Sequence, residues 1–322
     1  MRATRIEKHG GPEVLELQDV EDPTPGPGEV VVEIAAAGVN FIDTYQRSGA
    51  YPSDVPIGLG LEATGRITAI GEGVTHRSVG DHVGWTGVRG SYAEALAVPS
   101  DKLVQVPEAI SLDVAAAALL QGMTAHYLSQ STYALGRDDT ALVYAAAGGV
   151  GRLLVQFAKR RGAKVIACTS TQEKADAVRA LGADEVILYR DVDIAETVRD
   201  LTGGAGVDVV YDSVGKATFE ASLDSLKPRG LMVLYGGASG QVPPIDLQIL
   251  NQKGALFVTR PTLIYYTATP DELNWRAGAV FDLVESSQLD VLIHDRYPLA
   301  EAARAHRDLE SGTTTGKLLL VP

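Results

Sequence analysis

The feature that most constrains this chain is a glycine-rich turn between an apolar run and a segment of helical periodicity. The turn occupies residues 144–151 and follows the apolar run 141–143. Small residues at such a turn let the backbone approach a pyrophosphate, while the first N–H groups of the helix point at the anion. Ala146 replaces the first glycine of the usual G-x-G-x-x-G pattern, so the neighbouring segments must decide whether the turn binds a phosphate. We interpret the turn as a phosphate-binding turn.

The segments after the turn alternate between helix-like and strand-like patterns. Residues 152–161 place apolar side chains on one face, Gly162 ends this helix, and 163–167 indicates a buried strand. Further helices are predicted at 174–181 and 194–201, and further strands at 184–189, 207–212 and 231–235. This alternation predicts an α/β fold with a doubly wound parallel sheet of the Rossmann type.

The end of the second strand indicates which dinucleotide is bound. An acid at this point would accept hydrogen bonds from a ribose 2′-OH and repel a 2′-phosphate. The chain has Cys168 to Thr171 and then Lys174, so hydroxyls and a cation stand where the acid would be. Glu173 opposes this interpretation, but on a helix it projects about 100° away from Lys174. We predict NADPH, with a solvated Lys174 on an exposed helix as the alternative.

Composition predicts a cytoplasmic protein without nucleic-acid or membrane partners. The 322 residues, 45% of them hydrophobic, suffice for two packed domains. The single cysteine, Cys168, excludes a disulfide framework or a cysteine-based zinc cluster, and we predict it to be a small apolar filler. No apolar run approaches 18 residues, and the N-terminus is polar. The net charge of −13 disfavours binding to phosphate-rich surfaces.

The first part of the chain has a different residue pattern from the part in which helices and strands alternate. Short β-rich runs such as 29–35 and 62–70, punctuated by proline and glycine, predict a small barrel-like domain over 1–105. A buried helix at 115–120 leads into the sheet domain. After a strand at 255–258, an amphipathic stretch at 271–284 and the run 317–321 indicate a return to the first domain. We therefore predict one domain from 1–120 and 262–322, with 121–261 inserted in it.

Five segments together resemble a known family. They are residues 38–45, 47–49, 145–151, 209–215 and 258–261. With them the chain resembles the medium-chain dehydrogenase/reductase superfamily, and within it the zinc-independent NADPH:quinone oxidoreductases related to ζ-crystallin. The resemblance covers essentially the whole chain and implies a GroES-like catalytic domain that carries an inserted NADPH-binding Rossmann domain.

Two positions argue against the zinc site found elsewhere in this superfamily. Asn40 stands where the zinc enzymes have a ligand cysteine, and Leu61 stands where their G-H-E motif has a ligand histidine. A zinc ion needs several converging ligands, and the six histidines show no ligand spacing. We predict that the chain holds no metal.

Without a Lewis acid, an easily reduced acceptor is the better substrate. Alcohol oxidation would lose several kcal/mol of transition-state stabilisation, whereas a quinone stacked on the nicotinamide accepts reducing equivalents readily. The prediction is an NADPH-dependent quinone reductase. Two alternatives stay open: an NADPH-dependent enone or enal reductase, and a noncatalytic NADPH-binding protein with a structural or RNA-binding role.

The predicted acceptor pocket lies in a loop at residues 40–51. Asn40 is expected to donate its amide to an acceptor or to the nicotinamide, and Tyr45 and Tyr51 to supply ring faces and hydroxyls. Tyr45 is a hypothetical proton donor, and Arg47 a cation for a developing quinol oxyanion. The alternatives are a turn-capping Asn40, a core Tyr45 and a surface Arg47.

The resemblance also implies a set of cofactor contacts. These are Asn40, Thr124, Tyr127, Gly148, Gly149, Val150, Ser170, Lys174, Tyr189, Ser213, Tyr235, Gly236 and Thr259. Gly312 stands where relatives can place an arginine, which puts a C-terminal phosphate contact in doubt. The apolar strand 255–258 would form a sheet edge, so we predict a homodimer that pairs two such edges.

Overall fold

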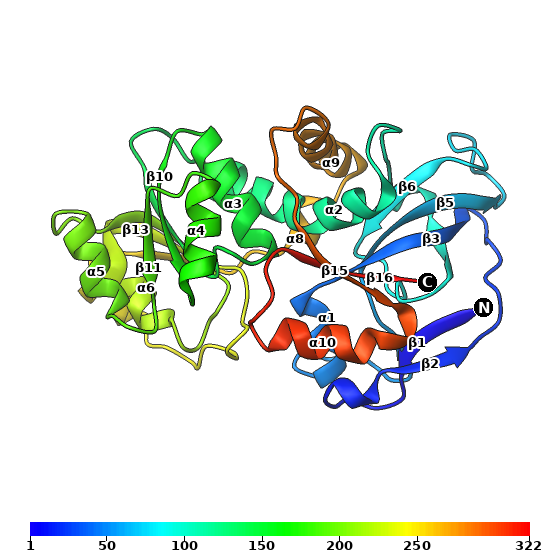
Figure 1. Ribbon diagram of the computed structural model, residues 1–322, viewed down its shortest axis with the longest axis horizontal. Coiled ribbons are helices and arrows are strands. Elements are labelled where there is room, and N and C mark those ends of the chain that lie inside the picture. Colours follow the sequence, from blue (N-terminus) through cyan, green and yellow to red (C-terminus); the bar gives the residue numbers. More distant parts are fainter. The chain divides into compact units, whose positions relative to one another are not determined.

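A computed structural model describes residues 1–322, which form two compact units (Figure 1). One unit comprises Met1–Met123 and Thr267–Pro322, and the other comprises Thr124–Tyr266. The predicted limits, 120 and 261, lie a few residues before these boundaries. The second unit is thus an insertion between the two segments of the first.

The inserted unit is built on a six-stranded parallel sheet. Its order is β11-β10-β9-β12-β13-β14, which confirms the predicted doubly wound sheet. Every residue of β12 is buried, as expected for a strand covered on both faces. The strands are β9 (Thr140–Val143), β10 (Lys164–Thr169), β11 (Glu185–Leu188), β12 (Val207–Asp212), β13 (Leu226–Leu234) and β14 (Phe257–Thr259).

Helices cover this sheet and connect its strands. The helices α3 (Gly149–Arg160) and α4 (Gln172–Ala180) pack on β9, β10 and β11. The helices α5 (Ile194–Leu201) and α6 (Phe219–Ser225) pack on each other, α5 on β11 and α6 on β12 and β13. Strand order reverses at β9, which has β10 on one side and β12 on the other. Ligands of such sheets bind outside the carboxyl ends of the strands at this reversal.

Shorter elements complete the inserted unit. They are the π-helical segment η3 (Leu128–Thr132) and the helices α7 (Gln248–Gln252) and α8 (Leu263–Tyr266). Cys168 is fully buried in the apolar core of the sheet, as predicted, and burial raises the pKa of its thiol.

The other unit is β-rich, as predicted. Its larger sheet has the order β15-β16-β3-β5-β6-β8, with β7 also paired to β3. Strand β16, at the C-terminus, pairs antiparallel with β3, so Leu319 lies opposite Gly38. The strands are β3 (Glu29–Val39), β5 (Glu62–Ile70), β6 (His82–Thr86), β7 (Ala95–Pro99), β8 (Leu103–Gln105), β15 (Ile293–Pro298) and β16 (Lys317–Val321).

A three-stranded sheet and short turns of 3-10 helix lie beside the larger sheet. The small sheet has the order β2-β1-β4 and consists of β1 (Arg2–Ile6), β2 (Glu16–Asp19) and β4 (Ile57–Gly58). The 3-10 turns are η1 (Pro12–Val14), η2 (Ser100–Lys102) and η4 (Leu299–Glu301). None of the helices combines the length and apolar character needed to cross a membrane.

Four longer helices belong wholly or partly to this unit. They are α1 (Phe41–Ser48), α2 (Leu112–Tyr127), which runs on into the inserted unit, α9 (Pro270–Glu285) and α10 (Ala302–Glu310). Helix α9 matches the predicted amphipathic stretch, whereas α10 was not predicted. Helix α10 lies beside α1 (Figure 1).

Helix α1 corrects the predicted loop at 40–51. The carboxylate of Asp43 accepts a hydrogen bond from the Asn40 backbone N–H at 2.8 Å and thereby caps the first turn. Gly49, at φ 78°, ends the helix in the left-handed conformation that glycine adopts without strain. Both signals are local, but the segment is too short and polar for apolar periodicity to reveal it.

Candidate functional site

The glycine-rich turn has the geometry of a phosphate-binding turn. It joins β9 to α3, and Gly148 is the N-cap of the helix. Ala145 has φ 46°, and the Gly148 N–H donates to the Ala145 carbonyl at 2.8 Å, so the chain turns sharply. A Cβ on Gly151 would overlap the Ala145 carbonyl oxygen, which explains a glycine there. Gly148, Gly149 and Val150 thus begin a helix whose first N–H groups lack helical acceptors.

A second cluster lies where β10 and β11 end. These strands pair in parallel, with Thr169 opposite Leu188, so Ser170 and Tyr189 follow neighbouring strand ends. Lys174 lies one turn further, in a helix capped by the Thr171 hydroxyl, which accepts from the Lys174 backbone N–H at 3.3 Å. This arrangement brings together three of the predicted cofactor residues.

The sequence interpretation missed Arg190 in this cluster. Partial burial lowers the pKa of Lys174, and the neighbouring Arg190 cation lowers it further. Two cations that repel each other at the end of β10 and β11 favour an anion there. The available signal was the position of Arg190 directly after Tyr189 at the end of the third strand.

The ends of β12 and β13 bring together Ser213, Tyr235 and Gly236. The Tyr235 N–H donates to the Asp212 carbonyl at 2.8 Å, and a Cβ on Gly236 would overlap Ser213. Asp212 is buried, and its carboxylate accepts from two backbone N–H groups and from the hydroxyls of Thr218 and Ser222, which fixes this turn.

Three further cofactor candidates lie apart from these turns. Thr259 ends β14, two strands from β12. Thr124 and Tyr127 lie in the last turn of α2, where the buried Tyr127 ring stacks on Tyr266 with centroids 4.2 Å apart. Their contacts with a cofactor stay predictions.

In the β-rich unit, a buried ion pair contacts the side chain of Asn40. The Lys317 ammonium lies 2.5 Å from Glu62 Oε2, and the two side chains are only 1% and 0% exposed. Glu62 Oε1 accepts from the Leu120 backbone N–H at 2.6 Å, so the carboxylate is also tied to α2. A Cβ on Gly38 would overlap Glu62 Oε2 and lie 2.7 Å from the Lys317 side chain, so a glycine leaves room for the pair.

The pair dictates how the Asn40 amide is oriented. An ammonium can only donate, so the Asn40 atom 2.7 Å from Lys317 Nζ must be the carbonyl oxygen. The amide nitrogen then donates to Glu62 Oε2 at 3.0 Å and to the Gly38 carbonyl at 3.2 Å. Both amide hydrogens therefore have acceptors within the chain, and donation from Asn40 to a ligand stays a prediction.

This donor set does not fit a zinc ion. Leu61 offers no ligand atom, and the neighbouring Glu62 carboxylate is neutralised by an ammonium rather than by a metal. No group of three or more His, Cys, Asp or Glu side chains in the chain is arranged to hold a metal ion. The pairing of Glu62 with Lys317 was not predicted, because the two residues lie 255 positions apart.

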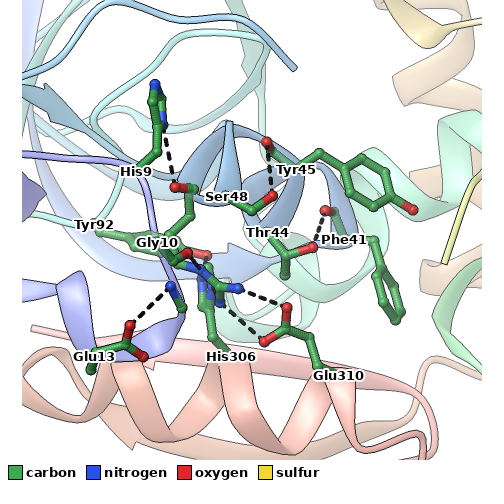
Figure 2. A network of polar contacts seen from close by, with 12 residues as sticks. His9, Gly10, Glu13, Phe41, Thr44, Tyr45, Ser48, Tyr92, His306 and Glu310 are labelled. Carbon is green, nitrogen blue, oxygen red and sulfur yellow. Dashed lines mark hydrogen bonds and ion pairs between the residues drawn. The ribbon is translucent and has the colours of Figure 1, made fainter. Parts of the chain in front are cut away.

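The candidate acceptor residues of α1 and its flank divide into two groups. The Tyr45 ring lies 5.2 Å from the Tyr51 ring and 6.3 Å from the Phe41 ring, measured between centroids. These three rings form an aromatic cluster. Arg47 takes part in a different network, and its partners Gly10, His306 and Glu310 are labelled in Figure 2.

The predicted role of Arg47 must be corrected. Its side chain is only 3% exposed, so it is no surface residue. The guanidinium forms a bidentate ion pair with Glu310, at 2.7 and 3.1 Å, and also donates to His306 and to the Gly10 carbonyl. A cation already paired with a carboxylate is poorly suited to neutralise a quinol oxyanion. Its partner lies 263 residues away, which sequence patterns do not reveal.

We expect Lys317→Met to destabilise the protein by about 3–5 kcal/mol, because Glu62 would keep a buried charge without its partner. Urea unfolding measures this cost. Glu62→Gln in the same chain should restore part of the loss, since it removes the stranded charge. Arg304→Met is the matched control, because Arg304 pairs with Glu301 at 2.8 Å on the surface and should cost no more than about 1 kcal/mol. Equal losses in the two single variants would contradict this account.

Comparison with known proteins agrees with these two units. The model of the alcohol dehydrogenase GroES-like domain matches residues 26–108, and that of the zinc-binding dehydrogenases matches residues 149–268. A quinone oxidoreductase of Pseudomonas aeruginosa is 48% identical over 98% of this chain and 97% of its own. A 2-haloacrylate reductase of a Burkholderia species is 41% identical over 99% of this chain and 98% of its own.

A solved structure supports the same assignment. The structure of Escherichia coli quinone oxidoreductase complexed with NADPH has a TM-score of 0.98 and 45% identity, and the match covers 100% of both chains. Identity at this level over the full length confirms the resemblance stated from the motifs. The chain therefore belongs to the quinone oxidoreductase family of the medium-chain dehydrogenase/reductase superfamily and is an oxidoreductase.

Proposed function

We propose that the protein is an NADPH-dependent quinone reductase that works without a metal. The observation that carries the proposal is the end of β10 and β11, where hydroxyls, Lys174 and Arg190 replace the acid expected for NADH. The E. coli relative complexed with NADPH supports the same cofactor. Zinc independence is supported by Asn40 and Leu61, which stand at two zinc-ligand positions of the superfamily, and by the Lys317–Glu62 ion pair beside them.

In this proposal each group of residues has a separate task. The N-terminus of α3 holds the pyrophosphate, and Lys174 and Arg190 hold the 2′-phosphate. Ser213, Tyr235 and Gly236 orient the nicotinamide end beyond the strand reversal. Bound NADPH supplies the hydride. The aromatic cluster of Phe41, Tyr45 and Tyr51 offers ring faces to a flat quinone, and the Tyr45 hydroxyl is the candidate proton donor.

An activated alkene is the second candidate substrate. The 41% identical 2-haloacrylate reductase favours it, because a carbon–carbon bond conjugated to an electron-withdrawing group also accepts a hydride. A noncatalytic NADPH-binding role has no comparable support, and an RNA partner conflicts with a net charge of −13. A cytoplasmic location stays a prediction.

Lys174→Ala should raise the Kd for NADPH about 10- to 100-fold, because it removes a charge-assisted contact worth about 1.5–3 kcal/mol. The Kd for NADH should stay nearly unchanged, since NADH lacks the 2′-phosphate. Fluorescence titration of both cofactors measures the effect. Arg179→Ala is the control, because Arg179 lies on the same helix but pairs with Asp176 at 2.9 Å. A similar loss for NADH would show that Lys174 does not select the phosphate.

The acceptor is tested by NADPH oxidation in EDTA-treated protein, with 1,4-benzoquinone and a simple enone assayed in parallel. We expect turnover with the quinone, and faster turnover with NADPH than with NADH. Turnover with the enone alone would support the second candidate. Tight NADPH binding without turnover on either acceptor would contradict a catalytic role.

We also propose a homodimer formed through β14. This strand is one of the two edges of the six-stranded sheet, and Phe257 on it is 60% exposed. Pairing two such edges across a two-fold axis would continue the sheet. Sedimentation equilibrium should give a dimer mass, and Phe257→Lys should shift the mass toward the monomer. A monomer mass independent of concentration would refute the proposal.

A further inference from the structure

A closed ring of buried hydrogen bonds holds one face of α1. Its members are Asp43 and Arg47 on α1, Tyr92 in the loop before β7, and His306 on α10, and all four are buried. Asp43 and Arg47 are four residues apart, so both project from the same face of the helix. Figure 2 shows His306 and Glu310 on α10, with the Tyr45 ring pointing away from them.

The direction of every bond in the ring follows from donor chemistry. Arg47 can only donate, so His306 Nδ1, at 3.0 Å, must accept. His306 is then a neutral imidazole with its hydrogen on Nε2, which donates to the Tyr92 oxygen at 3.1 Å. The Tyr92 hydroxyl in turn donates to Asp43 Oδ2 at 2.9 Å. The backbone of α1 closes the ring between Asp43 and Arg47.

The electrostatics of the ring agree with this direction. Burial and the Arg47 cation lower the pKa of His306 to about 3, so the imidazole stays neutral near pH 7. Burial raises the pKa of Asp43 to about 7, while the Asn40 N–H, the Tyr92 hydroxyl and the Lys317 cation oppose this rise and the Glu62 carboxylate adds to it. Asp43 Oδ1 has no hydrogen-bond partner, so the carboxyl depends on the two donors at Oδ2.

The ring connects to the candidate site through Asn40. Asp43 Oδ2 accepts from the Asn40 backbone N–H as well as from Tyr92, and the Asn40 side chain meets Lys317 and Glu62. Phe41 and Tyr45 each stand two positions before Asp43 and Arg47. Two positions correspond to about 200° around a helix, so the aromatic side chains lie on the face opposite the ring.

We propose that Tyr92 and His306 are positioning residues of the acceptor site. Through Asp43 and Arg47 they fix the rotation of α1 and thereby the placement of Tyr45 and Asn40. The inference rests on the proposed function, since it concerns how that function is supported. Neither residue belongs to the candidate catalytic or cofactor-binding set. Apolar side chains of similar volume often stabilise a core as well as buried polar groups do, so a role in orientation explains the ring better than stability alone.

The test compares two variants that each remove one buried tyrosine hydroxyl from a carboxylate. Tyr92→Phe deletes the hydrogen bond to Asp43 and the one that the Tyr92 oxygen accepts from His306, but it keeps the aromatic side chain that packs edge-on against His306 at 5.8 Å. Tyr297→Phe is the matched control, because Tyr297 is also buried in this unit and donates to Asp308 at 2.8 Å, outside the ring. The readouts are kcat and KM for 1,4-benzoquinone, the Kd for NADPH, and amide hydrogen exchange in α1.

We expect Tyr92→Phe to lower kcat/KM for the quinone at least tenfold, to leave the Kd for NADPH within twofold, and to speed exchange in α1. Tyr297→Phe should change none of these. His306→Gln should retain more activity than His306→Leu, because glutamine can both accept from Arg47 and donate to Tyr92. Unchanged kcat/KM in Tyr92→Phe would overturn the proposal, whether or not exchange in α1 changes.

Failure of the proposed function would look different. If wild-type protein turned over no quinone, the quinone assignment would fail. The wild type and the two tyrosine variants would then be compared with the enone as the acceptor. If neither acceptor were reduced, α1 would position no acceptor and the inference would be overturned together with the catalytic role. Faster α1 exchange in Tyr92→Phe would then still identify the ring as a structural support.

Discussion

The buried Lys317–Glu62 ion pair is the interaction on which the β-rich unit depends most. It joins the C-terminal strand β16 to β5, and the same carboxylate reaches the backbone of α2 and the side chain of Asn40. Removing two charges from water is costly, and this cost is offset only when the remaining donors and acceptors are satisfied. Glu62 meets this condition with three donors, and Gly38 supplies the space.

The ion pair and the hydrogen-bonded ring form one continuous polar core. They meet at Asn40, whose side chain faces Lys317 and Glu62 while its backbone N–H donates to Asp43. Polar networks of this kind have fewer alternative packings than an apolar core, because each donor must find its acceptor. Helix α1 is therefore held at its N-cap by the ion pair and along one face by the ring. Phe41 and Tyr45 project from the opposite face of the helix.

The inserted unit was predicted closely because its signals are local. The glycine-rich turn, the buried strand β12 and the cation at Lys174 each depend on neighbours in sequence, and periodicity reveals such elements. The β-rich unit was predicted only in outline. The sequence predicts a loop where helix α1 lies, because the capping by Asp43 and the end at Gly49 are short signals in a polar segment.

The contacts that define the candidate site in the β-rich unit are long-range. Arg47 finds Glu310, and Glu62 finds Lys317, across more than 250 residues in each case. No property of the separate segments selects these partners. The pairing of β16 with β3 brings Lys317 toward Glu62, and the packing of α10 beside α1 brings Glu310 to Arg47. The sequence thus identifies Arg47 as a cation in the segment 40–51, but only the tertiary structure reveals that it pairs with Glu310.

The activity that we propose for the protein is hydride transfer from NADPH without a metal. Stopped-flow single-turnover oxidation of NADPH by 1,4-benzoquinone tests it, with metal-stripped protein and NADPH deuterated separately at each C4 position. Because a fixed nicotinamide exposes one face, the account predicts a primary isotope effect with one diastereomer only, at a rate that added zinc does not increase. Oxidation without an isotope effect from either position, or only after zinc is added, would contradict the account.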